Sequence, residues 1–474
     1  MNIPNWSDVV KHSKDTVVQV FAGIAKFNWF EPFKTPQRLQ HAGSGFFVSD
    51  QGYLVTNFHV VDEAVSIKIQ IPTFGQEQFS AEVCGVYPDM DIALLRLTDE
   101  DFEKVRSKLG SIPVLQLGNS DEVYRTQGVL ALGYPLAGQG LKSTQGIVSG
   151  FEKIGFTSYI QTTAPLNPGN SGGPSLNIKG EVIGVNFAGV LAAQNVGFII
   201  PTNDITPALK DLLNVKLLRK PYLGGIFAYV NEDLVGFLGN PEGGGFYVAE
   251  VFKNSSLEKA GVQPGDMIYE INGHHLDMFG EISVPWAEDR ISVFDLLNRY
   301  KVGSSIEMVL YRRGKRLDIQ FTLERGVVLP IRVIYPKYEK VDFEVFGGMV
   351  MMQLTLNHVN ALVEHNPLFY KYAKIENQDK PKLVITSVLP GSQAHRCRSI
   401  EVGNVIKEVN GEPVSTLDEF RAAILKGNDN KFLTLRFENK VFAVLSMQKI
   451  EAQEEELSKV HMYKVSDLFK KTSK

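Results

Sequence analysis

Residues 167–174 read Asn-Pro-Gly-Asn-Ser-Gly-Gly-Pro, and this stretch decides how the rest of the chain is interpreted. A serine hydroxyl is a weak nucleophile at neutral pH, so it needs a nearby general base and a third group that orients the base. It also needs backbone N–H donors directed at the developing oxyanion. The glycines around Ser171 allow the sharp turns that such a loop requires. The stretch therefore predicts a catalytic serine loop, and the alternative is a glycine-rich surface turn.

Two further stretches supply candidates for the base and for the group that orients it. His59 follows the apolar run at 54–57, and Asp91 precedes the apolar run at 92–95. Each residue alone has an ordinary explanation, as a structural histidine or as a turn aspartate. With Ser171 they occur in the chain order His, Asp, Ser, which is that of chymotrypsin-like proteases and differs from that of subtilisins and α/β-hydrolases. Order and spacing predict His59 and Asp91 in one β-barrel and Ser171 in the next.

The first 200 residues contain many short strand-like runs separated by glycine turns, which is typical of an all-β barrel or sandwich. We expect strands at 16–22, 45–48, 53–56, 65–70, 92–97, 128–132, 146–149 and 182–187. A helix is expected over 202–213 with Asn203 as its cap, because apolar residues recur there at helical spacing. Residues 216–221 are expected to form a linker.

The first half of the chain resembles the HtrA/Deg family of trypsin-like proteases that carry PDZ domains. The matching segments are Gly43-Ser44-Gly45-Phe46, residues 52–57, His59-Val60-Val61, residues 91–95, Gly133-Tyr134-Pro135, residues 146–149, the Ser171 loop and residues 180–186. The resemblance implies an ATP-independent serine endopeptidase that degrades unfolded or damaged proteins. His59, Asp91 and Ser171 would form its catalytic triad, and no metal or other cofactor would be needed. The expected oxyanion-hole residues are Gly169, Asn170 and Ser171, with the N–H groups of Gly169 and Ser171 as donors.

Some positions depart from the family pattern. Thr163 stands where the family commonly has aspartate, Pro165 where it has alanine, and Phe58 where an asparagine usually precedes the histidine. By family position, Pro165, Leu166 and Ala188 would line the S1 pocket. None of the three is charged, so Lys or Arg at P1 would leave a buried cation unpaired, which is costly. We expect an apolar S1 pocket of modest size that accepts Val, Ala, Leu or similar residues.

A weak internal repeat predicts two similar α+β modules in the second half of the chain. Residues 260–273 and 400–411 share, or nearly share, the pattern Gly-[Asp/Asn]-x-Ile-x-x-[Ile/Val]-Asn-Gly, which ends in a hairpin turn. Expected helices follow at 293–299 and 416–425. This half resembles the plant organellar Deg branch most, in which a PDZ domain precedes a degenerate PDZ-like domain. The residues behind this looser resemblance are Gly265-Asp266, 288–291, 311–315, 347–350 and 466–468.

PDZ domains bind a peptide C-terminus as an added strand and hold its carboxylate with backbone N–H groups. In the first module the candidate carboxylate loop consists of Leu223, Gly224, Gly225 and Ile226. The second module has a poorer counterpart at 346–349, and the strand that follows carries Met349, Met351 and Met352. Such methionines favour adaptable packing or subunit contact, with the module's own core as the alternative. We expect the first module to bind peptide C-termini and the second to serve assembly.

Length and composition agree with a multidomain protein. At roughly 150 residues per domain, the 474 residues predict about three domains. They are a chymotrypsin-like double β-barrel protease at 1–215, a PDZ domain at 220–326, and a degenerate PDZ-like domain with a tail at 335–474. The formal net charge is −4 and the Lys and Arg residues are scattered, so no nucleic-acid partner is expected. The 2 cysteines cannot form a disulfide framework.

Neither a membrane span nor a secretory signal is recognisable in the chain. We therefore expect a soluble protein of the cytoplasm, or of the periplasm or an organelle lumen if a targeting segment lies outside this sequence. The aromatic residues Trp6, Phe27, Trp29, Phe30 and Phe33 lie outside the expected strands. Clustered exposed aromatics usually mark an interface, so they favour a homo-oligomer, of trimers if the family resemblance holds. The alternative is that they pack on their own barrel.

A second hypothesis belongs to a different functional class. The chain would then be a PDZ scaffold or a chaperone-like holdase with a silent protease domain. Proteases that lose activity usually lose a triad residue, and His59, Asp91 and Ser171 are all present. This favours the serine endopeptidase over the scaffold.

Overall fold

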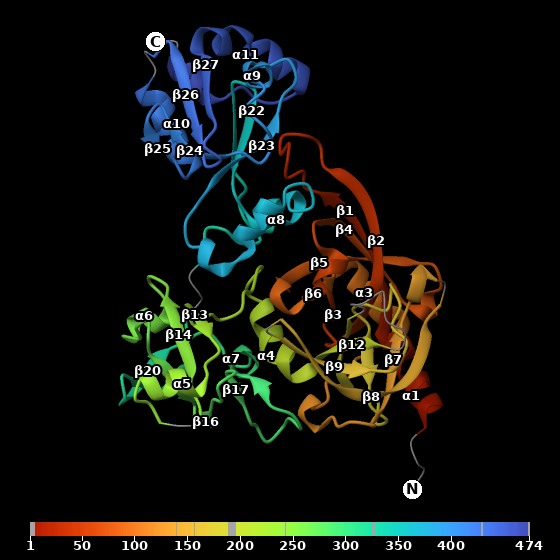
Figure 1. The fold of residues 1–474 in the computed structure, drawn as a ribbon. Helices are drawn as coiled ribbons and strands as arrows, with labels where there is room; N and C mark the ends of the chain where they lie inside the picture. Colours follow the sequence, from red (N-terminus) through yellow and green to blue (C-terminus); the bar gives the residue numbers. More distant parts are fainter. Residues whose placement is uncertain are drawn as a thin grey trace. The chain divides into compact units, whose positions relative to one another are not determined.

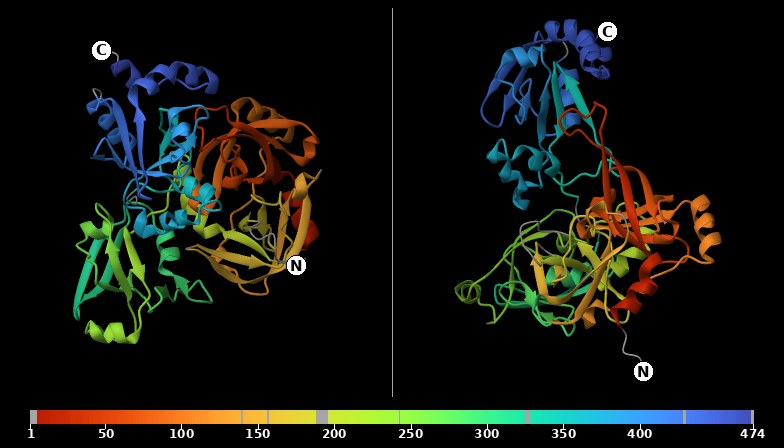
Figure 2. Two further views of the ribbon diagram at one scale, coloured as in Figure 1. Left: turned by 45° about the horizontal axis from the view of Figure 1, so that its top comes forward. Right: turned by 90° about the vertical axis from the view of Figure 1, so that its right-hand side faces the viewer.

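The computed structural model describes residues 5–138, 140–155, 157–187, 196–241, 243–324, 328–427 and 430–472. The chain divides into two compact units (Figures 1 and 2). The first unit contains Met1–Ile24 and Arg38–Val327, and the second contains Ala25–Gln37 and Val328–Lys474. Within the described ranges, no helix is long and apolar enough to cross a lipid bilayer.

The first closed barrel has the strand order β1-β2-β3-β6-β5-β4 (red to orange in Figure 1). Its strands are β1 (Val17–Lys26), β2 (Gln37–Phe47), β3 (Tyr53–Asn57), β4 (Ala64–Gln70), β5 (Gln78–Tyr87) and β6 (Ile92–Leu97). The short helices are α2 (Phe58–Val61), η2 (Pro72–Phe74), η3 (Pro88–Met90) and α3 (Asp99–Leu109). Nearly every residue of β3 and β6 is buried, which explains why these strands read as unbroken apolar runs.

The second closed barrel has the order β10-β11-β12-β9-β8-β7. Its strands are β7 (Gly128–Gly133), β8 (Lys142–Ile154), β9 (Thr157–Thr162), β10 (Pro174–Leu176), β11 (Val182–Phe187) and β12 (Gly197–Pro201). The helices beside the two barrels are α1 (Trp6–Ser13), η1 (Lys14–Thr16), η4 (Ser120–Glu122), η5 (Pro135–Ala137) and α4 (Thr202–Leu212). The expected cap of α4 is wrong: the helix begins at Thr202, and the N–H of Asn203 donates to Ser120 Oγ over 3.0 Å.

The first PDZ-type module follows in the same unit, with the sheet order β13-β14-β15-β19-β20. Its strands are β13 (Gly225–Ala228), β14 (Phe246–Val251), β15 (Met267–Ile271), β16 (His274–His275), β17 (Glu281–Ile282), β18 (Ile291–Ser292), β19 (Ser305–Arg312) and β20 (Lys315–Thr322). Its helices are α5 (Glu232–Phe237), α6 (Ser256–Lys259) and α7 (Val293–Asn298). Ile271 pairs with His274, which confirms the two-residue Asn-Gly hairpin.

The second module has the sheet order β21-β22-β23-β24-β26-β27. Its strands are β21 (Phe343–Phe346), β22 (Met349–Gln353), β23 (Leu383–Val388), β24 (Val405–Val409), β25 (Glu412–Pro413), β26 (Phe432–Phe437) and β27 (Phe442–Ser446). Its helices are α8 (Leu356–Leu362), η6 (Pro367–Ala373), η7 (Ile375–Asn377), α9 (Gln393–Cys397), α10 (Leu417–Lys426), α11 (Met447–His461) and α12 (Asp467–Thr472).

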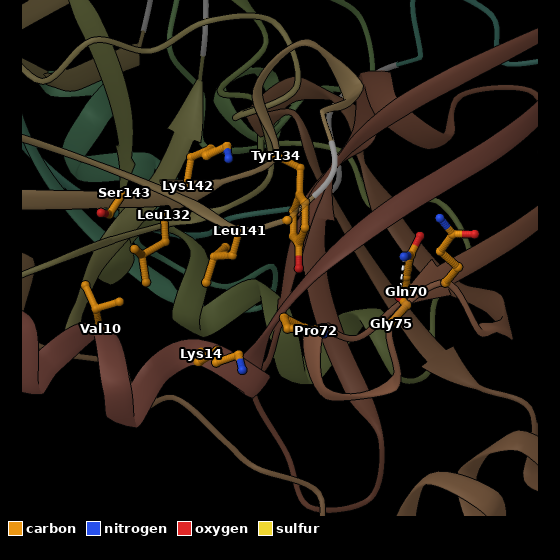
Figure 3. Close-up of a pocket in the computed structure, with 12 residues that line it drawn as sticks. Val10, Lys14, Gln70, Pro72, Gly75, Leu132, Tyr134, Leu141, Lys142 and Ser143 are labelled. Atoms are coloured by element: carbon orange, nitrogen blue, oxygen red, sulfur yellow. Dashed lines mark hydrogen bonds between the residues drawn. The ribbon is translucent and has the colours of Figure 1, made fainter.

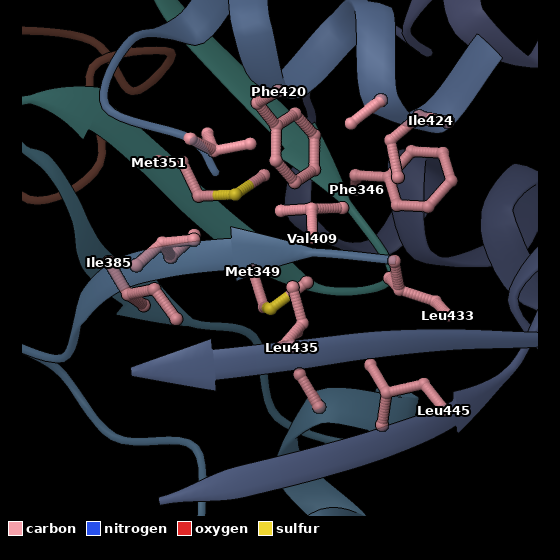
Figure 4. Packing of buried hydrophobic residues seen from close by; sticks show 14 of the residues in the cluster. Phe346, Met349, Met351, Ile385, Val409, Phe420, Ile424, Leu433, Leu435 and Leu445 are labelled. Carbon is pink, nitrogen blue, oxygen red and sulfur yellow. The ribbon is translucent and has the colours of Figure 1, made fainter. Parts of the chain in front are cut away.

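The methionines of β22 are fully buried. Met349 and Met351 pack with Phe420 and other apolar residues in the core of the second module (Figure 4), and Met352 is also buried. The expectation that they provide a subunit contact is therefore wrong, and the core alternative is right. The expected fold class, a double-barrel trypsin-like domain followed by two PDZ domains, is confirmed. The domain limits 1–215, 220–326 and 335–474 stay predictions.

The segment Ala25–Gln37, which links β1 to β2, packs with the second module and not with the barrel. The Trp29 ring meets the His358 ring edge-on at 5.1 Å, and the Phe33 ring lies 5.6 Å from that of Tyr463. The Phe30 carbonyl accepts a hydrogen bond from Thr386 Oγ1. These aromatic residues are half-buried and pack within their own chain, against the second module.

Candidate active site

Strand register brings the candidate base and aspartate together. Strands β3 and β6 pair antiparallel, with Asn57 opposite Ile92. His59 lies in α2, directly after β3, and Asp91 lies directly before β6. The two side chains therefore emerge at the same end of one strand pair in the first barrel.

Two hydrogen bonds join the two residues. The backbone N–H of His59 donates to Asp91 Oδ1 over 2.9 Å, and His59 Nδ1 lies 2.7 Å from Asp91 Oδ2. Asp91 has a left-handed backbone with φ of 52°, which aspartate tolerates better than most residues. Its own N–H donates to Pro88, and its carbonyl accepts from the N–H of Phe58. The carboxylate is thus held in place by its backbone as well as by its partner.

This contact determines the proton position and the basicity of His59. A carboxylate can only accept, so Nδ1 carries the proton and Nε2 is left as the acceptor. Burial lowers the pKa of His59, but the hydrogen bond to Asp91 and its negative charge outweigh burial, and the net pKa is raised. The His59 side chain is 48% exposed. The ring of Phe187, at the end of β11, faces the His59 ring edge-on, with 6.4 Å between the ring centroids.

Ser171 lies in the turn between β9 and β10 of the second barrel. This turn packs against the end of β3: a Cβ placed on Gly172 would lie 2.2 Å from Ser44 O and 2.9 Å from Asn57 N. Gly172 also has φ of +84°, so only glycine fits there without strain. The Ser171 loop therefore packs against Asn57, the last residue of β3, which lies two residues before His59. In the described part of the chain, Ser171 Oγ makes no hydrogen bond, as is common for catalytic groups without substrate.

Of the three expected oxyanion-hole residues, Gly169 and Ser171 were the expected donors, and the three N–H groups differ in availability. The N–H of Asn170 donates to the Asn167 carbonyl over 2.9 Å, so it is already occupied. Among the described residues, the N–H groups of Gly169 and Ser171 have no hydrogen-bond partner. These two groups are therefore free to bind an oxyanion.

Two of the three expected S1 residues, Pro165 and Leu166, lie in the described part of the chain. Pro165 is exposed, and its carbonyl accepts a hydrogen bond from Thr144 Oγ1. Leu166 packs against Gly197, where an added Cβ would lie 2.8 Å from Leu166 Cδ1. Ala188 lies outside the described residues. The structure thus places apolar Leu166 against β12, and Gly197 is a neighbour that sequence reasoning missed.

Other residues near the site were also missed by sequence reasoning. Ser44 was noted only as part of a family motif, yet it is fully buried beside the Ser171 loop. Phe187 ends an apolar strand and carried no signal of its position beside His59. Tyr134, on the far side of the loop, lines a pocket together with Val10 and Leu141 (Figure 3). None of the three candidate triad residues is among the described residues that line this pocket.

The first PDZ-type module has an open strand edge at the expected carboxylate loop. The Leu223 carbonyl accepts from Leu257 N and the Gly224 carbonyl accepts from Phe252 N, and these two bonds hold the loop in place. Gly225 and Ile226 begin β13, which is the first strand of its sheet and, among the described strands, pairs only with β14. The loop thus leads into a strand that can receive another strand.

The second module has the same loop geometry but no such edge. A Cβ on Gly224 would lie 2.0 Å from Ser255 Cβ, and a Cβ on Gly348 would lie 2.0 Å from Ser392 Cβ. The two loops are therefore structural equivalents. However, β21 pairs antiparallel with β22, and Phe346 lies opposite Met349. The edge that corresponds to β13 is already occupied by a strand of the same chain.

Over the described ranges, no group of three or more His, Cys, Asp or Glu side chains lies close enough together to hold a metal ion.

Comparisons with known protein families match three regions. A trypsin-like peptidase domain matches residues 43–185. PDZ domains match residues 228–284 and 335–466. The first match contains both barrel segments with His59, Asp91 and Ser171, and the other two correspond to the two modules.

Similar proteins cover most of the chain. A probable periplasmic serine endoprotease, described as DegP-like, from Hahella chejuensis is 28% identical over 471 residues, which is 94% of this chain and 91% of the relative. A protein of the same description from Pseudomonas fluorescens is 31% identical over 404 residues, covering 84% of this chain and 76% of the relative. A Bacillus subtilis protein, serine protease Do-like HtrA, is 31% identical and covers 60% of this chain and 64% of its own length.

Solved structures share the fold. The HtrA-type protease AlgW with a decapeptide aligns with a TM-score of 0.53 at 24% identity, covering 68% of this chain and 98% of that chain. The same protease with a tripeptide gives a TM-score of 0.53 at 24% identity, covering 68% and 97%. At this identity the likeness concerns the fold alone.

Proposed function

This chain belongs to the HtrA/DegP family of trypsin-like serine proteases with PDZ domains, and from this premise we propose that Ser171, His59 and Asp91 form its catalytic triad. As a family member the chain is a serine endopeptidase. One observation carries the assignment of residues: Asp91 holds His59 by two hydrogen bonds, next to the loop that presents Ser171.

In the first half of the reaction, Ser171 Oγ attacks the carbonyl carbon of the scissile peptide bond. His59 Nε2 accepts the hydroxyl proton, and Asp91 stabilises the imidazolium that forms. The N–H groups of Gly169 and Ser171 stabilise the negative oxygen of the tetrahedral intermediate. His59 then donates the proton to the leaving amine nitrogen, the C–N bond breaks, and an acyl-enzyme remains on Ser171.

In the second half, water replaces the leaving amine. His59 Nε2 accepts a proton from the water as it attacks the ester carbonyl, and the same two N–H groups hold the oxyanion. Breakdown of this intermediate returns the proton to Ser171 Oγ and releases the new carboxylate. Protons and bonds balance over the two halves, and the chemistry requires no cofactor.

The proposed substrates are unfolded or damaged proteins, cleaved without ATP in protein quality control. A serine protease cleaves a peptide bond in an extended segment, and unfolded chains expose such segments freely. The uncharged Pro165 and Leu166 support cleavage after Val, Ala, Leu or similar residues. Product termini from casein, read by mass spectrometry, test this: apolar P1 residues are expected, and a majority of Lys or Arg would refute it.

We assign peptide C-termini to the first module. β13 has a free edge and follows the Leu223–Ile226 loop, which suits strand addition with the carboxylate at the loop. α7 lies beside β13, since the Phe294 and Phe227 rings meet at 5.7 Å. In the second module β21 already fills the corresponding edge, which supports a role other than peptide capture.

Paired variants of the full chain test this assignment. Gly224→Ala should abolish binding of a fluorescent peptide with a free C-terminus, because the new Cβ would meet Ser255. The matched Gly348→Ala makes the same contact with Ser392 and should leave binding unchanged. A peptide amidated at its C-terminus should not bind. If Gly348→Ala abolished binding and Gly224→Ala did not, the roles of the modules would be reversed.

A homo-oligomer built from trimers remains a proposal that rests on the family resemblance, because the aromatic segment no longer supports it. The closer relation of the second half to the plant organellar Deg branch is also a prediction from its sequence. Oligomer mass by sedimentation tests the first, and a monomer at micromolar concentration would contradict it.

Proteolysis of unfolded casein by the full chain tests the enzyme assignment. Wild type should degrade casein, and Ser171→Ala should not, although it folds equally well. Activity that survived in Ser171→Ala would refute the nucleophile. A folded wild type without activity would favour the PDZ scaffold or holdase.

A further inference from the structure

A buried hydroxyl from the first barrel contacts the loop that carries Ser171. Ser44 lies near the end of β2 and is fully buried. Its Oγ donates to the Gly169 carbonyl over 2.6 Å, and its backbone N–H donates to the Ser171 carbonyl over 2.9 Å. Ser44 therefore bonds to both residues whose N–H groups are the proposed oxyanion donors.

Three peptide planes determine where those N–H groups point. In a trans peptide the carbonyl and the N–H point in opposite directions, so a bond that fixes the carbonyl fixes the next N–H. The Pro168 carbonyl accepts from Leu136 N over 2.7 Å, which orients the N–H of Gly169. The Asn170 carbonyl accepts from Gly173 N over 3.0 Å, which orients the N–H of Ser171.

The plane between these two, from Gly169 to Asn170, is held at its carbonyl by Ser44 Oγ and at its N–H by the Asn167 carbonyl, to which Asn170 N donates over 2.9 Å. It is the one of the three that depends on a side chain, so it is the one that a substitution can release. The hydroxyl cannot turn to another partner, because it also accepts from Tyr134 N over 2.9 Å. A backbone N–H can only donate and a carbonyl can only accept, so the Ser44 proton must point to Gly169.

We propose that Ser44 is a positioning residue for the oxyanion hole, an inference that rests on the proposed function. Its hydroxyl keeps the Gly169–Asn170 plane fixed between the two donor N–H groups. Without it, the Gly169 carbonyl and the Tyr134 N–H lose their partner, and the plane keeps only the bond from Asn170 N to the Asn167 carbonyl, so it is less firmly fixed. The donors would then be poorly aligned with the oxyanion, whereas substrate binding elsewhere in the cleft would be retained.

Steady-state kinetics of Ser44→Ala on a fluorogenic peptide with an apolar P1 residue tests the proposal. We expect kcat to fall about tenfold to hundredfold, less than the roughly 10²–10³ that follows from loss of a whole donor. KM should change less than twofold. A peptide boronic acid, whose tetrahedral adduct places an oxygen at the oxyanion position, should lose affinity by a similar factor.

Thr202→Val is the matched control. Thr202, the first residue of α4, is also fully buried, and its Oγ1 donates to the Val182 carbonyl over 2.8 Å. Its loss removes the same kind of bond away from the loop, so stability should fall while kcat stays at the wild-type value. Wild-type kcat in Ser44→Ala, or an equal loss of kcat in both variants, would overturn the proposal.

If Ser44→Ala does not fold, Ser44→Cys decides, because its thiol is similar in size and a weaker donor. A lower kcat at unchanged KM supports the proposal, and wild-type kcat overturns it. These outcomes are separate from failure of the proposed function. If the proposed function were wrong, the wild type would not hydrolyse the peptide, or Ser171→Ala would hydrolyse it as well.

Discussion

The two barrels hold their halves of the candidate site in different ways. In the first, His59 and Asp91 sit at the ends of paired neighbouring strands and bond to each other twice. In the second, the loop carbonyls of Pro168, Gly169 and Ser171 accept from Leu136 and Ser44, and the donor N–H groups of the loop are open among the described residues. The acid–base half is thus complete by itself, whereas the nucleophile half depends on support from outside the loop.

The site is therefore easiest to disturb at the Ser171 loop. A strand pair that buries nearly all its residues is hard to move, so His59 and Asp91 should keep their geometry under most local changes. The loop is fixed by single hydrogen bonds, each of which can be lost separately. Substitutions around the loop should therefore lower activity while the geometry of His59 and Asp91 in the first barrel stays nearly unchanged.

The largest effect should follow from removing one chemical group in either half. Ser171→Ala and His59→Ala should each lower kcat by roughly 10⁶-fold, because triad members act as a unit. Both variants should unfold at the wild-type temperature. Peptide hydrolysis with a fluorogenic substrate measures this, and a variant that kept wild-type turnover would show that the halves do not act together.

Asp91→Asn tests the first barrel alone. It should lower kcat about 10⁴-fold, because an amide cannot hold the His59 tautomer with its proton on Nδ1. Asp89→Asn is the control, since Asp89 accepts from the backbone N–H of Lys220 and does not touch His59. The control should retain full activity. Equal losses in both variants would contradict the special role of Asp91.

Gly172→Ala tests the second barrel. The new Cβ would lie 2.2 Å from Ser44 O at φ of +84°, so the loop must move and kcat should fall at least about a hundredfold. Gly75→Ala in the first barrel has φ of +62° and open space around it, so it shares the strain and lacks the clash. Because φ of 62° with ψ of −118° strongly favours glycine, it should cost about 1–3 kcal/mol of stability and no activity. A comparable loss of kcat in Gly75→Ala would remove the contrast between the barrels.

The smallest effect concerns pH. His59 must be neutral to accept a proton, and its pKa is raised above 6.5 because Asp91 outweighs burial. Plots of kcat/KM against pH should therefore fall on the acid side with a midpoint above 6.5. In Asp91→Asn the opposite charge is gone, so the residual activity should fall with a midpoint at lower pH. An unchanged midpoint would mean that Asp91 does not set the basicity of His59.

The sequence predicted the serine protease class and its two barrels better than the contacts that hold the Ser171 loop. The order His59, Asp91, Ser171 and the runs at 92–97 and 182–187 predicted the barrels well, since buried strands carry a local apolar signal. The hydrogen bond from Ser44 to Gly169 joins residues 125 positions apart, and no local sequence pattern predicts it. The turn in which Asn170 N donates to the Asn167 carbonyl likewise depends on backbone geometry that the sequence does not show.

The second module shows the same limit. Its glycine loop was recognisable, and its equivalence to the first loop is seen in the contacts of Gly224 and Gly348 with serines. What fills the neighbouring edge, β21, is a matter of chain context that the repeat does not encode. The packing of the aromatics in residues 25–37 likewise depends on a partner more than 300 positions away, as the bond from Thr386 to Phe30 shows.

Labelling with a fluorophosphonate probe is the most direct test that Ser171 is an activated nucleophile. Such a probe reacts covalently with a serine whose hydroxyl is deprotonated by a neighbouring base, and the modified residue is read by mass spectrometry. Wild type should carry one adduct, on Ser171, and Ser171→Ala should carry none. An adduct on another residue, or a folded and unlabelled wild type, would contradict the proposed triad.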